Sequence, residues 1–132
     1  MKYLLTIYTD ESRWAEATPQ DLQDMMSAYE AYTREATEAG VMLGGEGLAR
    51  SGTATTVRVR GDEVLTSDGP FAETREQLGG YYLLDCADED EAIGWAARIP
   101  GTRYGSAIEV RPVMDYEAVG GDSKVHSREV AR

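Results

Sequence analysis

The sequence predicts an α+β protein with a ferredoxin-like subunit, in which β-α-β-(hairpin)-β-α-β elements form an antiparallel sheet with helices on one face. Runs rich in strand-forming residues open the chain at 3–8 and close it at 107–113. Apolar residues recur at helical spacing in 18–40 and 88–99. Between these helices, TATTVRVRGDEVLTS alternates polar and apolar residues around Gly61-Asp62, which is typical of a hairpin.

The first helix has a clear beginning and end in the sequence. Thr18 is a capping residue, Pro19 suits the first helical position, and Asp21 completes a pattern like a capping box. Gly40 is a typical helix terminator. We expect the apolar face of this helix to belong to the core rather than to a cofactor surface. Its members are Leu22, Met25, Met26, Tyr29 and Ala36.

The second helix begins with the acidic run Asp88-Glu89-Asp90-Glu91. Acidic residues at a helix start favour the helix dipole, and this run lacks the alternating spacing of a calcium loop. We therefore interpret it as helix capping rather than as a metal site. Pro100-Gly101 ends the helix. Its predicted apolar stripe is Ala92, Ile93, Ala96 and Ile99.

Two strands contain paired glycines, in VMLGGEGLA and in LGGYYLLDC. Gly45-Glu46-Gly47 does not fit a phosphate-binding loop, because Arg50 stands where a third glycine is needed and a strand follows. We expect these glycines to allow bulges or close backbone approach. In the last strand, Pro112 indicates an edge or a strand end.

The first strand has apolar atoms on both sides, since Tyr3, Leu5 and Ile7 alternate with Leu4, Thr6 and Tyr8. Helices on one face leave the other face of the sheet without a cover. A second subunit is the expected cover, so the sequence predicts a homodimer.

Length and charge limit the classes of function. The chain has 132 residues, enough for one domain at 1–117, followed by a flexible tail at 118–132 with many charges and no periodicity. A net charge of −11 argues against direct contact with nucleic acid or an anionic membrane. Without a signal peptide or an apolar run of membrane-spanning length, the protein is expected to be cytoplasmic.

Few side chains suit catalysis by histidine or cysteine. Cys86 is the only cysteine, and its apolar neighbours predict an inert core thiol. His126, the only histidine, lies in the expected tail, where nothing would orient its ring. Nucleophile pairs with histidine and His/Cys metal clusters are thereby excluded. The sequence predicts no cofactor and no metal centre.

The stretch SDGPFAETREQ at 67–77 is the strongest local feature. Gly-Pro restricts the backbone, and Asp before Gly commonly stabilises a turn. Rigid loops also hold the polar groups of pockets, so a structural and a functional reading both stay open. Asp68 is the candidate acid or base, with Phe71 and Glu73 beside it. Glu46, flanked by glycines, and Arg111, in the last strand with Glu109 on the same face, complete the candidate ligand-binding set.

Several runs together resemble the YCII-related proteins of the DGPF-domain type: MKYLLTIY, TPQDLQDMMSAYEAYTREATEAGV, GGEGLA, TSDGPFAETREQLGGYYLLD and EVRPVM. The resemblance spans about residues 1–117 and implies a dimeric α+β barrel with a pocket between sheet and loops. Relatives of the YCII type carry a His–Asp pair. Here Asp21 and Ile99 stand at the matching positions, so that pair is absent. Bacterial relatives are often encoded beside extracytoplasmic-function sigma factors, which suggests a regulatory role.

Three hypotheses about function follow. The first is a dimeric module that binds a small organic molecule next to the DGPF loop. The second is a small-molecule enzyme in which Asp68 transfers a proton and Arg111 or a backbone amide stabilises developing charge. The third is a non-catalytic dimer that binds a protein, such as a sigma factor. The sequence favours the first, with the activity undetermined.

Overall fold

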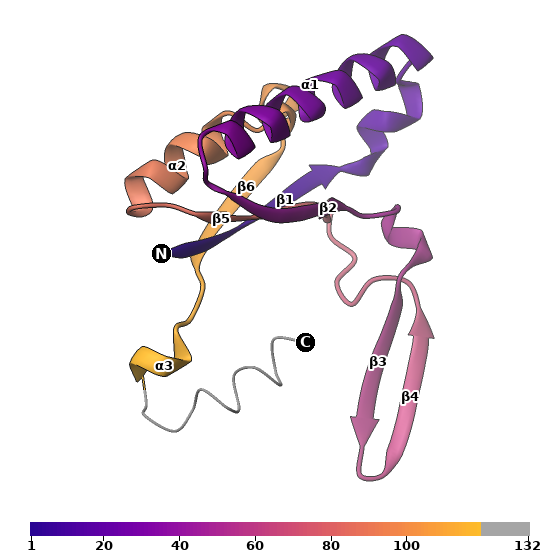
Figure 1. Cartoon of the computed structure of the whole chain (residues 1–132). Helices are drawn as coiled ribbons and strands as arrows, with labels where there is room; N and C mark the ends of the chain where they lie inside the picture. Colours follow the sequence, from indigo (N-terminus) through magenta and orange to yellow (C-terminus); the bar gives the residue numbers. More distant parts are fainter. Residues whose placement is uncertain (120–132) are drawn as a thin grey trace.

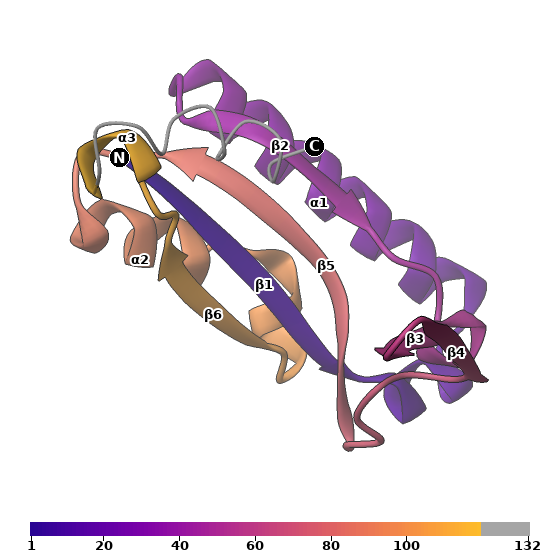
Figure 2. The same cartoon turned by 90° about the horizontal axis from the view of Figure 1, so that it is seen from below.

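The computed structural model describes residues 1–119 and shows an α+β subunit with a four-stranded antiparallel sheet. The sheet order is β2-β5-β1-β6, so each βαβ crossover spans one intervening strand, as the predicted split arrangement requires. Figure 2 shows these strands side by side. Their bounds are β1 Lys2–Asp10, β2 Met42–Gly47, β5 Glu76–Asp85 and β6 Ala107–Pro112.

Helices α1 (Pro19–Glu38) and α2 (Glu89–Ala97) cover one face of the sheet (Figure 1). The predicted hairpin forms a separate two-stranded ribbon of β3 (Thr55–Arg60) and β4 (Glu63–Asp68), which extends from the sheet on the side away from the helices (Figure 1). Shorter elements complete the subunit: η1 Glu11–Glu16, η2 Ser51–Thr53, η3 Pro100–Tyr104 and α3 Tyr116–Val119. The expected tail at 118–132 therefore begins within α3, and its residues from 120 on, with His126, lie outside the described residues.

The predicted helix caps are confirmed. The Asp21 amide donates to Thr18 Oγ1 at 3.1 Å, and the Thr18 amide donates to the Asp21 carboxylate at 2.9 Å. At the second helix, Asp88 Oδ1 accepts from the Glu91 amide at 2.9 Å. These local bonds satisfy backbone groups that a helix start leaves unpaired, which explains the acidic run without a metal.

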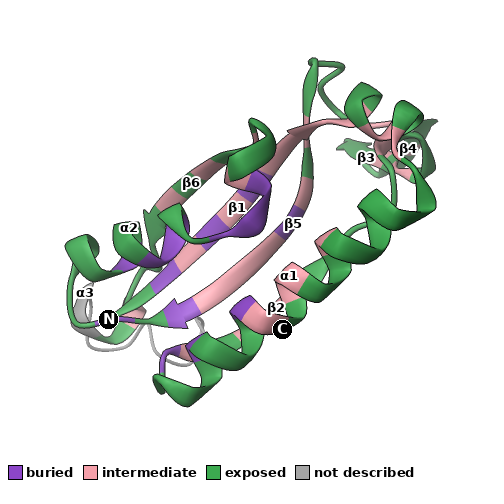
Figure 3. Ribbon diagram, turned by 90° about the horizontal axis from the view of Figure 1, so that it is seen from above, coloured by how far each residue is buried: buried purple, intermediate pink, exposed green. Residues whose placement is uncertain are grey.

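The core lies between the helices and the central strands β1 and β5 (Figure 3). Tyr3, Leu5 and Ile7 point towards the helices, and the Tyr32 hydroxyl donates to the Trp95 carbonyl at 3.0 Å. Cys86 is buried there, as predicted, and burial raises the pKa of its thiol. The other buried members are Ala36, Val41, Leu84, Ala92, Ala96 and Ile99.

Three core predictions are wrong for the single subunit. Leu22 and Met26 are 47% and 65% exposed, because the N-terminal half of α1 extends past the sheet beneath it (Figure 3). Ile93 is 49% exposed, whereas Trp95 takes the buried place on α2. Helical spacing identified an apolar face in each helix but not which part of it the sheet would cover.

The second face of the sheet carries Leu4, Thr6 and Tyr8, all partly exposed. In the antiparallel register, Leu83 lies opposite Leu4 and Tyr81 lies opposite Thr6, and paired residues share a face. No described element packs over this face (Figure 1). We call it the open face.

Candidate functional site

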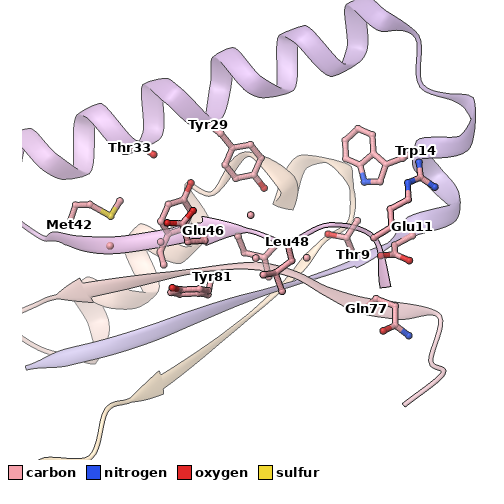
Figure 4. A pocket seen from close by; sticks show the side chains of 18 residues that line it. Thr9, Glu11, Trp14, Tyr29, Thr33, Met42, Glu46, Leu48, Gln77 and Tyr81 are labelled. Carbon is pink, nitrogen blue, oxygen red and sulfur yellow. The ribbon is translucent and has the colours of Figure 1, made fainter. Parts of the chain in front are cut away.

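A well-formed hollow lies between α1 and the β2–β5 half of the sheet (Figure 4). Its volume is about 580 Å³, within the range of small-molecule sites in proteins. Met42 lies at one end, and Trp14, Glu11 and Gln77 lie at the other (Figure 4). We call it the α1 cavity. It is also lined by Ile7, Thr9, Tyr29, Thr33, Gly44, Gly45, Glu46, Gly47, Leu48, Arg50, Gly79, Gly80, Tyr81 and Tyr82.

Glycines on two adjacent strands make the floor of this cavity. Gly47 on β2 lies opposite Gly80 on β5, which lies opposite the core residue Ile7. Without side chains, this part of the sheet leaves space beneath α1. The sequence-based expectation of close approach and bulges is confirmed: a Cβ on Gly80 would lie 2.9 Å from the Glu46 carbonyl oxygen, and the β1–β5 register shifts beside Gly79.

Tyrosines from the helix and the sheet form the opposite wall. Tyr29 projects from α1 towards the sheet (Figure 4). Burial raises the pKa of Tyr29 and of Tyr82, so both hydroxyls are neutral at physiological pH. The Gly101 backbone lies beside the Tyr29 hydroxyl and the Thr33 side chain beside the Tyr82 hydroxyl, and each partly offsets the rise in the tyrosine pKa. The wall is therefore aromatic, with each hydroxyl next to a polar group of the protein.

Glu11 joins one end of the cavity to the base of the β3–β4 ribbon. Its carboxylate accepts from the Ser51 hydroxyl at 2.6 Å and from the Ser51 amide at 2.8 Å. These two hydrogen bonds hold the pKa of Glu11 below its usual range. Because the pKa of Glu11 is lower in the folded protein, its hydrogen bonds to Ser51 stabilise the fold at pH values above the ordinary glutamate pKa. That stabilisation is lost as the pH falls through the lowered pKa.

Replacing Ser51 with alanine should therefore raise the Glu11 pKa towards the ordinary glutamate value, because the stronger hydroxyl bond is removed. Carboxyl titration by NMR measures this directly. Ser12→Ala is the matched control, since Ser12 bonds Asp10 instead. An unchanged Glu11 pKa in Ser51→Ala would show that the Ser51 hydrogen bonds do not lower it.

The DGPF segment forms a fixed turn at the base of the ribbon. Gly69 has a φ of +99°, a conformation that favours glycine. Its amide donates to the Ala54 carbonyl at 2.7 Å, and its carbonyl accepts from Thr56 Oγ1 at 2.9 Å. The Asp68 side chain is exposed, and its carboxylate forms no hydrogen bond among the described residues. Phe71 is 75% exposed and lies against the Arg58 guanidinium, 4.9 Å from the ring centre.

Gln77 connects this turn to the α1 cavity. Its Nε2 donates to the Ala72 carbonyl at 3.0 Å and to the Thr74 carbonyl at 2.8 Å, while the same residue lines the cavity. The glutamine that follows DGPFAE thus holds the loop closed at the cavity's end. Sequence reasoning quoted this glutamine within the motif and gave it no role.

The structure does not bring the five predicted site residues together. Glu46 contributes to the α1 cavity and is exposed at the outer strand. Asp68 and Phe71 lie outside that cavity, and Glu73 borders a shallow groove beside Pro70. Arg111 lies on the open face, where it pairs with Glu109 at 3.0 Å.

Of the lining residues, sequence reasoning had identified only Glu46 as a site residue; Tyr29, Trp14 and Thr33 are among those it did not identify. Tyr29 was assigned to the core from its helical spacing. The signal that the sequence offered was a tyrosine, with its polar hydroxyl, on the helix face expected to meet the sheet. The two positions where YCII relatives carry their His–Asp pair have structural roles here: Asp21 caps α1, and Ile99 is fully buried.

The fold and cavity define an α+β subunit with a ligand-sized hollow under its first helix. Residues 1–117 match the YCII-related domain, and the chain belongs to this family. An uncharacterised protein of Rhizobium meliloti (strain 1021) is 36% identical over 118 residues, covering 89% of this chain and 95% of that protein. Among residues 1–119, no helix has the length and apolar character needed to cross a membrane.

Proposed function

We propose that this YCII-related protein binds a small organic molecule in the α1 cavity. The observation that carries the proposal is a 580 Å³ hollow whose floor is made of glycines on two neighbouring strands. Side chains at these positions would fill the hollow, so the sequence keeps it open. Gln77 places the DGPF loop at the cavity's end, which supports the expected pocket beside that loop.

Binding is better supported than proton transfer by Asp68. A general base needs to lie within hydrogen-bond reach of its substrate, and Asp68 is exposed outside the cavity. The cavity's own titratable tyrosines are held neutral by burial. The roles of Asp68 as an acid or base and of Phe71, Glu73 and Arg111 in binding stay predictions, as does an association with a sigma factor.

The ligand experiment is a thermal melt of the intact chain against a library of small metabolites. A ligand present at about 100 times its dissociation constant adds about 2.7 kcal/mol of stability, an easily measured shift. We expect at least one uncharged organic compound to raise the melting temperature in a saturable way. A library of broad chemistry without any saturable stabiliser would contradict the proposal.

We propose, too, that a second copy of the chain covers the open face. Leu4, Tyr8 and Leu83 lie partly exposed there, and the β3–β4 ribbon extends on the same side (Figure 1). The ribbon's exposed valines would gain cover from such a partner; they are Val57, Val59 and Val64. Apolar strand faces of this kind pack favourably against their own copy in a symmetric dimer.

Leu83→Arg should convert the dimer to a monomer at micromolar concentration, because it places a charge at the middle of the buried face. Light scattering coupled to size-exclusion chromatography gives the mass directly. Leu22→Arg is the matched control, since Leu22 is 47% exposed on the helix side. A monomeric native chain, or a Leu83→Arg chain that stays dimeric, would refute the interface.

A further inference from the structure

We infer that the α1 cavity selects a flat, uncharged ring system as its ligand, a proposal that rests on the function proposed above. The inference comes from the shape of the floor, the chemistry of the walls, and the positions of the charged groups. Each points to the same class of molecule.

Part of the floor is bare backbone, which lets a flat molecule lie close to it. Gly47 and Gly80 are cross-strand partners, and Gly79 follows at the bulge beside them. No Cβ rises from any of the three, so the peptide planes of β2 and β5 themselves form the surface. A planar molecule can lie on such a surface over its whole area, whereas a puckered one touches it at a few atoms only.

The walls that face this floor are aromatic. Tyr29 projects from α1, and Trp14 projects from η1 towards the same hollow (Figure 4). Tyr82 lines the cavity from the strand side. Aromatic side chains contact other aromatic rings in stacked or edge-to-face arrangements worth about 0.5–1.5 kcal/mol beyond the area they bury.

Several hydroxyls of the walls already lie beside polar groups of the protein. The Tyr29 hydroxyl lies beside the Gly101 backbone, that of Tyr82 beside the Thr33 side chain, and Thr9 Oγ1 lies 2.9 Å from the Ser106 hydroxyl. A charged ligand needs free counter-charges or several free hydrogen-bonding groups once it leaves water. Hydroxyls that already face protein groups offer little of this to a charged ligand.

The charged residues of the lining do not favour an anion. Glu11 is kept ionised by its two bonds to Ser51, and Arg50 lies near enough to help lower the pKa of that carboxyl. The charge of Arg50 therefore already faces a carboxylate of the protein, so the lining offers no unopposed positive group to a carboxylate or phosphate ligand. Glu11 is also committed to Ser51, which leaves it poorly placed to pair with a cation.

Three probes of one carbon skeleton test this inference by calorimetry on the full chain. They are 2-naphthol, which is flat and neutral; decahydro-2-naphthol, which is puckered and neutral; and 2-naphthoate, which is flat and anionic. We expect 2-naphthol to bind about tenfold or more tightly than either of the others, from the stacking and desolvation terms above. We expect Gly47→Val, which fills the floor, to abolish 2-naphthol binding.

The outcomes separate this inference from the proposed function. If decahydro-2-naphthol or 2-naphthoate binds as tightly as 2-naphthol, and Gly47→Val removes that binding, the cavity is a site but the inferred ligand class is wrong. If 2-naphthol binds equally to native and Gly47→Val chains, it binds elsewhere and the inference fails. If none of the three binds, the inference fails, while the metabolite melts decide separately on the proposed function.

Discussion

A Gly47→Val chain should keep its fold and lose its ligand. Gly47 is part of the cavity floor, and a Cβ added there meets no atom within 4 Å. Valine is favoured in strands, so the free energy of unfolding should change by no more than about 1 kcal/mol. Its branched side chain would occupy the space above Gly80. The stabilisation of about 2.7 kcal/mol by a ligand at 100 times its dissociation constant should then disappear.

Thermal melts of native and Gly47→Val chains with each stabilising compound measure this loss. Gly94→Val is the control, because Gly94 on α2 does not line the α1 cavity and a Cβ there also meets nothing within 4 Å. Its response to ligand should equal that of the native chain. Retained stabilisation in Gly47→Val would place the ligand outside the α1 cavity.

Gly45→Ala should destabilise the subunit strongly. A Cβ at this position would lie 2.5 Å from Tyr82 Cδ1 and 2.6 Å from the Tyr81 carbonyl oxygen. The side chain can move, but the carbonyl belongs to the neighbouring strand of the sheet. Forced packing of this kind costs typically 1–3 kcal/mol. We expect a loss of that size, with partial loss of ligand binding because Tyr82 must shift.

Urea denaturation of Gly45→Ala and Gly44→Ala compares two adjacent glycines of one strand. The Gly44 variant should stay within about 0.5 kcal/mol of the native chain, as is usual for changes without steric conflict. Equal stability of the two variants would show that close contact at Gly45 is not what requires a glycine there.

Local chemistry explains why much of the fold is predictable from the sequence. Thr18, Asp21 and Asp88 cap helices through bonds to residues within three positions, so their role can be inferred from short patterns. The turn at Gly61 likewise follows from its neighbours, and the alternation in β3 and β4 follows from the strand period.

The cavity could not be predicted in the same way, because it depends on what lies opposite each residue. Paired glycines in two strands indicated close approach, and that is correct. That Gly47 and Gly80 are cross-strand partners beneath Tyr29 is a matter of register and helix placement. For the same reason, Leu22 and Met26 were assigned to a core that ends before it reaches them.

In the DGPF motif, the local backbone could be predicted from the sequence, but the contacts of its side chains could not. Its Gly-Pro pair was expected to restrict the backbone, and Gly69 adopts a positive φ that favours glycine. Its aromatic residue was expected to pin the loop to apolar surface, yet Phe71 is exposed against Arg58 in the subunit. The contact between loop and cavity runs instead through Gln77, whose partners are set by the folded path of the loop.

The most direct test is a titration of the isotopically labelled chain with a stabilising compound, followed by ¹H–¹⁵N correlation spectra. Glycine amides resolve well, and this chain places them at both candidate sites. Binding in the α1 cavity should shift the amides of Gly45, Gly47, Gly79 and Gly80 and leave Gly69 and Phe71 unchanged. Shifts confined to Gly69, Phe71 and their neighbours, with the strand glycines unmoved, would contradict it.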